Sequence, residues 1–388
     1  MNPLQRKEYT ITSEKEKLLL DTLQKRTDTE AKRLLSYLAL PDLTRTPHSP
    51  LYAVVQRLLS LPTLKDFDLI TIPEIIPSSE VFDLFNFPKD HPARTSSDSY
   101  YVEGGYILRP HPSVMWKYYL DLPEVQQKLE ENGRLGVMCY GKVYRRDEID
   151  WQHSNVLHQI DGLYIVRKDI QNVVQQDLEA VLLEVAESLF GKNLKSRFSV
   201  DHFPYTDPSI EMVISWRDQW VEILGSGIPH PQVIKNLGLD PEVYTGWAFG
   251  FGADRLAMLK MQIPDIRLLR STDERVTRQL TNIDNVYEPV SKYPPVVRDI
   301  SFVVTDSELN INQYYEMIRE VVGDEYVEEV KFLDEYRNAE RWGEGRTSYT
   351  IRIVYRNLER TLTNEEVDAL HSKLMTETEQ RYKAAIRK

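Results

Sequence analysis

The sequence predicts an α+β protein of two or three domains, and two observations carry this prediction. The C-terminal part has apolar patterns in the order strand, helix, strand, strand, helix, at residues 299–304, 311–322, 327–333, 348–356 and 364–382. This is the order of a split β-α-β domain of the ferredoxin-like kind. Upstream, Gly246, Gly250 and Gly252 end a strand that leads directly into a helix with an apolar face. A chain of 388 residues has room for both parts.

Composition indicates a soluble globular protein of a reducing compartment. Hydrophobic residues make up 41% of the chain, which supports a sizeable core. No run approaches the roughly 20 apolar residues of a membrane helix, and the charged start lacks the pattern of a signal or transit peptide. The single cysteine, Cys139, excludes an intramolecular disulfide framework and a cysteine-clustered zinc site. We therefore expect a cytoplasmic protein with no membrane partner.

Four segments are expected along the chain. They are a helical extension at residues 1–45, a main domain at 46–275, a linker at 276–290 and the C-terminal domain at 291–388. In the extension, Ser13 and Glu16 have the spacing of a helix capping box, and we expect a helix that docks on the main domain. An arm that touches a partner or RNA is the alternative. Thr363 and Glu366 form a second capping box before the last helix.

The sheet of the C-terminal domain could present one face to RNA. A net charge of -12 disfavours indiscriminate binding to nucleic acid, so an RNA partner must meet a local basic patch. The candidate side chains are the arginines of this domain, namely Arg298, Arg346, Arg352, Arg356 and Arg360. Because acids outnumber bases in this segment, solvated or ion-paired arginines are the alternative.

The most polar stretch is CYGKVYRRDEIDWQHSNVLHQIDG, residues 139–162. One strand ends at Arg145 and Asp147, a loop carries His153, and a second strand carries Gln159 and Asp161. Such a hairpin can hold a ligand, with arginine for anions and a carboxylate for an ammonium group. An exposed charged hairpin is an equally good interpretation. His153 and His158 have no carboxylate or third histidine at the spacing of metal ligands, so hydrogen bonding is the better interpretation of both.

Three further features could belong to a site. Arg255 opens the helix after the glycines, where a rigid guanidinium can hold phosphate oxygens, although packing is the commoner role of a glycine-rich strand. The aromatic rings beside prolines at 203–208 could form the wall of a pocket or belong to the core. Glu222 is expected between buried apolar neighbours, so its carboxylate needs an arginine or Mg²⁺.

Seven motifs in this order resemble those of the phenylalanyl-tRNA synthetases, class II aminoacyl-tRNA synthetases with a ferredoxin-fold anticodon-binding domain, in their single-chain, organellar-like form. They lie within residues 48–388 and are FNFPKDHPAR, GKVYRRDEIDWQHSNVLHQIDG, FPYTDPS, WVEILGSGIPHP, GWAFGFGADRLAMLKMQIPDIR, SKYPPVVRDISF and NLERTL. The resemblance implies an antiparallel sheet flanked by helices, with Pro73 at a dimer or interdomain interface. A monomer and a homodimer are both expected forms.

The resemblance also implies the reaction. ATP activates phenylalanine to phenylalanyl adenylate, which is passed to tRNA(Phe), with Mg²⁺ as cofactor. Two alternatives remain: a paralogue that adenylates an aromatic or related amino acid and transfers it to another acceptor, and an inactive relative that binds RNA or protein. No editing module separates the two domains, so we expect no hydrolytic proofreading of tyrosine.

The motifs assign roles to individual residues. Arg145 would hold the α-phosphate, and Arg255 would hold the γ-phosphate and stack on adenine. The other expected nucleotide contacts are Asp147, His153, Leu157, Glu222 and Gly252. The expected Mg²⁺ ligands are Glu222 and Asp207. The expected amino acid contacts are His111, Ser113, Gln159, Asp161, Phe203, Tyr205 and Ala248.

Several positions differ from the family pattern. Trp116 replaces a glutamine, Leu157 replaces the phenylalanine that stacks on adenine, and Tyr205 replaces a phenylalanine of the pocket. Pro112 and Ser113 stand where the family has Thr-Ser. These changes bear on amino acid specificity, because one hydroxyl or amide facing a side chain can change selectivity by orders of magnitude.

Overall fold

The structure is a computed structural model that describes residues 6–216, 219–289, 293–305 and 309–387. The chain forms two compact units. The first comprises Met1–Arg145, Val156–Ile263 and Leu280–Val286, and the second comprises Arg146–Asn155, Pro264–Gln279 and Tyr287–Lys388. The expected boundary at residues 290 and 291 lies outside the described residues, and the division into four segments stays a prediction.

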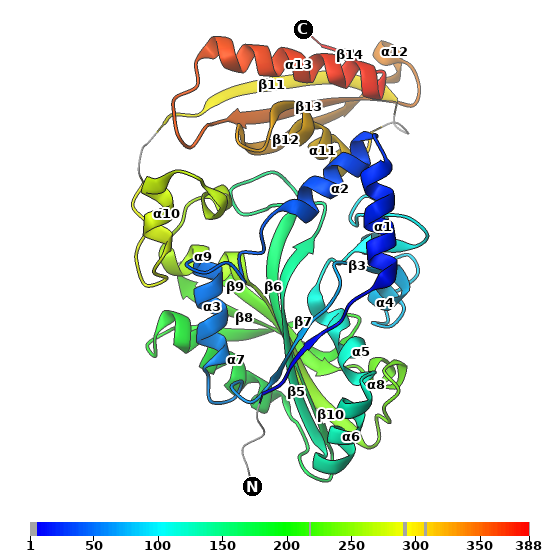
Figure 1. Cartoon of the computed structure of the whole chain (residues 1–388). Helices are drawn as coiled ribbons and strands as arrows, with labels where there is room; N and C mark the ends of the chain where they lie inside the picture. Colours follow the sequence, from blue (N-terminus) through cyan, green and yellow to red (C-terminus); the bar gives the residue numbers. More distant parts are fainter. Residues whose placement is uncertain (1–5, 217–218, 290–292, 306–308, 388) are drawn as a thin grey trace. The chain divides into compact units, whose positions relative to one another are not determined.

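An eight-stranded sheet forms the centre of the first unit, in the order β1-β2-β5-β6-β10-β9-β8-β7 (Figure 1). Its strands are β1 (Glu8–Thr10), β2 (Asp68–Thr71), β5 (Arg134–Tyr144), β6 (Val156–Arg167), β7 (Ser196–Asp201), β8 (Thr206–Trp216), β9 (Gln219–Pro229) and β10 (Tyr244–Gly252). In this spatial order, all neighbouring strands from β5 through β6, β10, β9 and β8 to β7 are antiparallel, whereas β2 pairs in parallel with both β1 and β5. The expected antiparallel sheet flanked by helices is confirmed.

Helices surround this sheet. They are α1 (Glu14–Lys25), α2 (Thr29–Ala39), α3 (Pro50–Leu59), α4 (Ser78–Phe82), α5 (Met115–Leu120), α6 (Pro123–Asn132), α7 (Gln175–Phe190), α8 (Pro231–Asn236) and α9 (Ala253–Met261), with 3-10 turns at Pro92–Arg94 and Pro112–Val114. Side chains of α5, α6 and α8 pack on the sheet face that carries Leu163 and Ala248. Helix α3 packs against α7 and α9 (Figure 1).

A small second sheet in this unit joins β3 (Ile75–Pro77) to β4 (Tyr106–Leu108). Residues 99–102, whose sequence is strand-like, form no strand, and Tyr101 makes an isolated bridge with Ile107. Pro73, expected at an interface, is buried within the first unit itself.

The N-terminal extension differs from its prediction in two ways. The sequence indicated only helices, but strand β1 precedes them and pairs with β2. Ser13 caps α1 by accepting the N–H of Glu16, as predicted. The Glu16 carboxylate, however, does not complete a capping box. It accepts the backbone N–H groups of Glu74 and Ile75 at 2.7 and 3.0 Å, which fastens α1 to β3.

The second unit has a four-stranded sheet in the order β12-β13-β11-β14. Its elements are α10 (Glu274–Leu280), β11 (Val296–Thr305), α11 (Ile311–Val322), β12 (Val327–Arg337), α12 (Ala339–Trp342), β13 (Arg346–Tyr355), α13 (Asn364–Tyr382) and β14 (Ala385–Ile386), with a 3-10 turn at Ile266–Arg270. The predicted order of strands and helices is confirmed, as is the Thr363–Glu366 capping box. Helix α12 and strand β14 were not predicted, because both are too short to give a periodic pattern.

Residues 146–155 connect β5 to β6 of the first unit, yet they pack with the second. Ile149 is 4% exposed and belongs to the apolar core of the second unit. Its carbonyl accepts the N–H of Val330 at 2.8 Å, and the Glu148 carbonyl accepts from Arg319 at 3.0 Å. Asn155 donates to the buried carboxylate of Glu316. This loop is therefore structurally part of the C-terminal unit.

Candidate active site

The candidate site lies on one face of the large sheet, across four neighbouring strands. The registers place Asp161 opposite Gly250, Gly250 opposite Gly225, and Gly225 opposite Glu211. Residues paired in this way point to the same face of a sheet. A Cβ at Gly250 would lie 3.0 Å from Asp161 Oδ1, and one at Gly225 would lie 2.8 Å from the Phe203 ring. The glycines thus leave space for side chains and a ligand above the strands.

A buried carboxylate marks one end of this face. Asp161 accepts a hydrogen bond from Ser113, whose hydroxyl is brought there by the 3-10 turn at Pro112–Val114. Burial raises the pKa of Asp161 to about 7. Its Oδ1 atom is buried and has no hydrogen-bond partner among the described residues. An uncompensated carboxylate of this kind is costly unless a cationic ligand meets it.

His111 and Trp116 also have buried polar atoms. They lie on either side of the 3-10 turn at Pro112–Val114, which brings Ser113 to Asp161. Both ring nitrogens of His111 and the indole Nε1 of Trp116 lack a hydrogen-bond partner in the described part of the chain. Burial, and then the charge of Arg145, lower the pKa of His111 to about 3, so the imidazole is neutral near pH 7. Unpaired polar atoms next to a buried carboxylate are typical of a ligand site.

Aromatic rings form the wall of the site. Phe203 and Tyr205 stack with centroids 5.6 Å apart, and Tyr205 also contacts Phe85 at 5.9 Å and Phe87 at 6.0 Å. Ala248 is 4% exposed and lies in the same apolar cluster as Tyr205. Sequence reasoning did not select Phe85 and Phe87, although the FNFPKDHPAR motif contains both.

Arg145 follows the end of β5 and is held from two sides. Its Nε donates to the Pro110 carbonyl at 2.9 Å, and one terminal nitrogen donates to Gln159 Oε1 at 3.2 Å. Leu157 precedes Gln159 by two positions on β6 and is half-buried. The structure therefore brings Arg145, directly after β5, to the strand β6 that carries Gln159 and Asp161.

Arg255 lies in the first turn of α9, a helix that begins directly after Gly252. It donates to the Glu222 carbonyl at 3.4 Å and lies 3.9 Å from the Glu222 carboxylate. The expectation that Glu222 is enclosed by apolar neighbours is wrong, because its side chain is 46% exposed. A β-bulge between Met212 and Val213 shifts the register there, so Glu222 pairs with Val213.

Carboxylates that could supply oxygen ligands to a metal lie near Arg255, namely Glu211, Glu222 and Asp201. Burial, and then the charges of Glu222 and Asp201, raise the pKa of Glu211 to about 7. Mutual repulsion of three carboxylates is relieved by a divalent cation, and Mg²⁺ prefers such oxygens. In the described ranges no group of three or more His, Cys, Asp or Glu is spaced to hold a metal ion. Glu222 and Asp201 act on Glu211, and Asp207 lines a cavity that Asp201 also lines.

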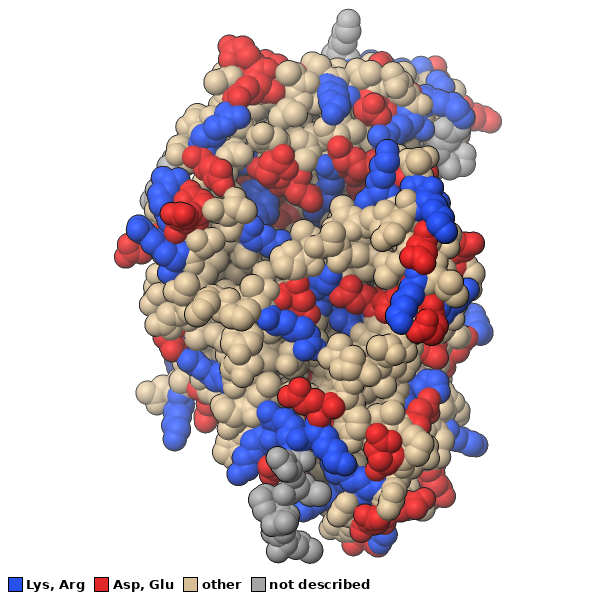
Figure 2. Space-filling model, viewed as in Figure 1, with Lys and Arg blue, Asp and Glu red and all other residues tan. Residues whose placement is uncertain are grey.

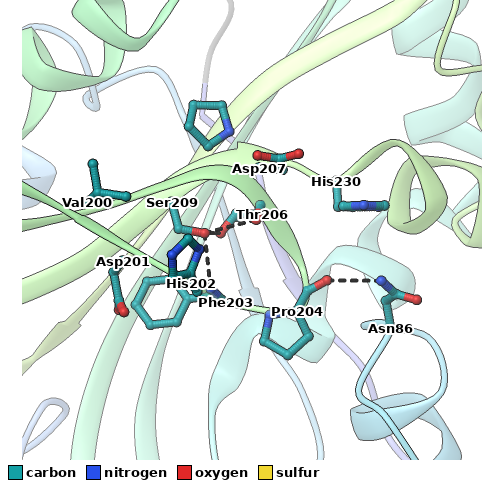
Figure 3. A pocket seen from close by; sticks show the side chains of 11 residues that line it. Asn86, Val200, Asp201, His202, Phe203, Pro204, Thr206, Asp207, Ser209 and His230 are labelled. Carbon is teal, nitrogen blue, oxygen red and sulfur yellow. Dashed lines mark hydrogen bonds between the residues drawn. The ribbon is translucent and has the colours of Figure 1, made fainter.

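That cavity has a volume of about 410 Å³ and opens beside the aromatic wall (Figure 3). Asp207, His202 and His230 line it, together with Phe203. The Thr206 and Ser209 hydroxyls lie 2.7 Å apart, and Ser209 accepts the N–H of Phe203 at 3.1 Å, which fixes the turn that carries the ring. Sequence reasoning did not select the two histidines, which show no spacing pattern.

Asp147 and His153, expected at the nucleotide, belong to the loop of the second unit. Asp147 accepts the N–H of Glu148 at 2.9 Å, and His153 Nδ1 lies 2.7 Å from the Asp150 carboxylate. These contacts shape the loop itself. The nucleotide roles of both residues stay predictions.

Most of the arginines expected to meet RNA have carboxylate partners. Arg298 pairs with Asp368 at 2.8 Å, Arg352 with Asp299 at 2.8 Å, and Arg356 with Glu328 at 3.1 Å. Arg346 is exposed, and Arg360 pairs with Glu366 at 2.8 Å. The ion-paired alternative thus describes four of these five side chains.

Comparison with known proteins identifies both units. Residues 38–280 match the family model described as tRNA synthetases class II core domain (F), and residues 291–387 match the ferredoxin-fold anticodon binding domain. The chain is 37% identical to a chloroplastic/mitochondrial phenylalanine--tRNA ligase of Arabidopsis thaliana, covering 81% of this chain and 71% of the relative. It is 35% identical to the mitochondrial enzyme of Mus musculus (77% and 71%) and 31% identical to that of Saccharomyces cerevisiae (81% and 81%).

The fold, the site face and these matches define a class II tRNA synthetase with an anticodon-binding domain. The chain belongs to the phenylalanine--tRNA ligase family of these ligases, which confirms the resemblance. The expected cytoplasmic location is contradicted, since these relatives are named as organellar enzymes. Within the described residues, no helix has the length and apolar character needed to span a membrane.

Proposed function

We propose that this chain activates phenylalanine with ATP and transfers it to tRNA(Phe). The observation that carries the proposal is a buried oxygen of Asp161, which has no hydrogen-bond partner in the described part of the chain, near a wall of aromatic rings. An α-amino acid with an aromatic side chain supplies what both parts lack, namely an ammonium group and a planar apolar ring. The phenylalanine--tRNA ligases named above support the choice of phenylalanine.

The amino acid is held by groups at fixed positions. Asp161 and Gln159 receive the ammonium group, and Ser113 fixes the Asp161 carboxylate. The neutral His111 donates a hydrogen bond to the substrate carboxylate from a ring nitrogen that is otherwise unpaired. Phe203, Tyr205 and Ala248 contact the phenyl ring, and the stacked rings leave room for a flat side chain.

Activation needs charge neutralisation more than proton transfer. A substrate carboxylate oxygen attacks the α-phosphorus of ATP, the bond to the bridging oxygen breaks, and pyrophosphate leaves. Arg145, held by Pro110 and Gln159, neutralises the α-phosphate in place, which requires little reorganisation during the reaction. Arg255 binds the γ-phosphate, and Leu157 and Gly252 contact the nucleoside.

Mg²⁺ is the expected companion of ATP, and Glu222 is the residue here that would hold it. When bound, the ion neutralises phosphate oxygens during displacement. The charge of Glu222 helps to raise the pKa of Glu211, and this repulsion supports Glu222 over Asp207 as the residue that would hold the ion.

In the second half-reaction a ribose hydroxyl of tRNA attacks the adenylate carbonyl, AMP leaves, and the hydroxyl proton is released.

The test is phenylalanine-dependent exchange of pyrophosphate into ATP, measured with each of the twenty amino acids. We expect a signal with phenylalanine and charging of tRNA(Phe) in a second assay. No phenylalanine signal would refute the proposal. Exchange without charging of total tRNA would favour the alternative of a different acceptor, for which Trp116 and Tyr205 are the positions to examine.

An organellar location is part of the proposal and rests on the relatives named above. A C-terminal fluorescent fusion expressed with mitochondrial and plastid markers tests it, and a diffuse cytosolic signal would contradict it. Whether the chain is a monomer or a homodimer stays a prediction, which light scattering during size-exclusion chromatography decides.

A further inference from the structure

The charges of the second unit limit where it can bind RNA phosphates. Arg298, Arg352 and Arg356 all have carboxylate partners on the same unit. A paired arginine must give up or share its partner to meet a phosphate, which reduces the gain from binding. Cations without a carboxylate partner are therefore the better candidates for contacting the RNA backbone.

Two such cations surround one indole at the end of this unit. Arg341 and Arg387 lie over the Trp342 ring, 5.4 and 5.3 Å from its centroid. The arginines come from distant points in the sequence, since α12 carries Arg341 and the segment after β14 carries Arg387. Among the described residues neither has an ion pair with a carboxylate; Arg387 donates to the Ser348 hydroxyl at 2.6 Å. Blue side chains gather at this end of the unit in Figure 2.

An exposed tyrosine completes the group. Tyr336 meets Trp342 edge-to-face with centroids 5.4 Å apart, and its hydroxyl accepts from Asn338 at 3.3 Å. Tyr336 is 47% exposed. It lies in the second part of the edge strand β12, residues 331–337, where every residue is exposed. The ring is thus held in place by its neighbours even though it is exposed to solvent.

We propose that Tyr336, Trp342, Arg341 and Arg387 form a binding site for an unpaired nucleotide of tRNA. The Tyr336 ring offers a face on which a base can stack, and the two guanidinium groups offer donors to its phosphate. The site rests on the proposed function, because tRNA is the RNA substrate of the proposed reaction. It replaces the paired arginines as the expected point of contact.

The test compares matched variants in two assays. Tyr336→Ala is expected to weaken tRNA binding about 5- to 100-fold, and Tyr336→Phe, which keeps the ring, to retain it. Arg387→Gln is expected to weaken binding and to reduce the slope of log affinity against log salt by about 0.7. Arg352→Gln removes the same charge from a paired arginine and is expected to leave affinity unchanged. Filter binding gives the affinity, and circular dichroism checks the fold.

Pyrophosphate exchange with phenylalanine separates this inference from the proposed function. All four variants should exchange like the parent, because none touches the candidate active site. Absence of exchange in the parent refutes the proposed function, and tRNA affinity still tests the nucleotide site. Equal losses in Arg387→Gln and Arg352→Gln, or in Tyr336→Phe and Tyr336→Ala, would overturn the site. Unchanged binding in Tyr336→Ala would overturn it as well and would favour a protein partner for this surface.

Discussion

The eight-stranded sheet of the first unit and the four-stranded sheet of the second unit differ in how their ionisable groups are paired. At the eight-stranded sheet, Asp161 on β6 and His111, directly before the 3-10 turn at Pro112–Val114, are buried, and among the described residues each has a polar atom without a hydrogen-bond partner. On the four-stranded sheet, the Asp299 and Arg352 side chains are exposed and paired at 2.8 Å. Burial raises the pKa of Asp161 to about 7, whereas the hydrogen bond from Arg352 lowers the pKa of Asp299.

This contrast separates side chains that await a ligand from side chains that satisfy each other. An exposed ion pair contributes little to stability, and its removal is tolerated. Burying an ionised carboxylate without a partner costs free energy, which a bound cation or protonation of the group offsets. The predictions below test this difference, from the largest expected effect to the smallest.

Arg145→Ala should reduce the rate of phenylalanine-dependent pyrophosphate exchange about 10²- to 10³-fold, the usual cost of losing one fixed donor to a developing charge. Arg134 opens the same strand, β5, and is exposed, so Arg134→Ala is the matched control and should exchange normally. Thermal unfolding should show both variants folded. Normal exchange in Arg145→Ala would remove this arginine from the site.

Asp161→Asn should raise the KM for phenylalanine about 10- to 100-fold, because a charged hydrogen bond to the ammonium group is lost. The KM for ATP should change much less, since Asp161 faces the amino acid end. Steady-state exchange kinetics measure both constants. Equal increases in the two would indicate a structural defect instead.

The same residue predicts a pH dependence of stability. The folded pKa of Asp161 is raised to about 7, so its stabilising contribution is present below the unfolded pKa and is lost as pH rises through 7. Without substrate, the free energy of unfolding should fall by roughly 3 kcal/mol from this group between about pH 4 and pH 7. Denaturant titrations of the parent and Asp161→Asn measure it, and a parent curve that matches the variant at every pH would contradict the prediction.

Gly225→Ala should raise the KM for phenylalanine about tenfold, because its Cβ would lie 2.8 Å from the Phe203 ring and push it into the pocket. A ring can shift by small rotations, so the protein should still fold. Exchange kinetics with phenylalanine provide the measurement. A KM equal to that of the parent would mean that Phe203 does not form the pocket wall.

Arg352→Gln should leave the unfolding temperature and pyrophosphate exchange unchanged, since the ion pair with Asp299 is exposed and screened. Differential scanning calorimetry at low and high salt checks this expectation. A clear loss of stability would show that the paired charges of the four-stranded sheet contribute more to stability than an exposed ion pair should.

The sequence predicted the parts of the fold that have regular patterns. Helices α11 and α13 begin and end where predicted, at Ile311–Val322 and Asn364–Tyr382. Strand β1 and helix α12 were missed, because three or four residues do not establish a period. For the site, the motifs indicated Arg145, Gln159 and Asp161; in the structure Gln159 and Asp161 lie on β6, and Arg145, directly after β5, donates to Gln159. The exposure of Glu222 could not be predicted, because a β-bulge depends on pairing with a partner strand.

Residues 146–155 make this chain difficult to divide into separately expressed pieces. A fragment that stops before residue 293 would keep Ile149 but lose the apolar core around it, including Phe302 and Ile351. Its Asn155 would also lose Glu316. The complementary C-terminal fragment would have a hole where Ile149 fits. Genes that encode the two units separately would therefore yield two defective products, and complementation in trans would require a short insertion loop to thread back into its core.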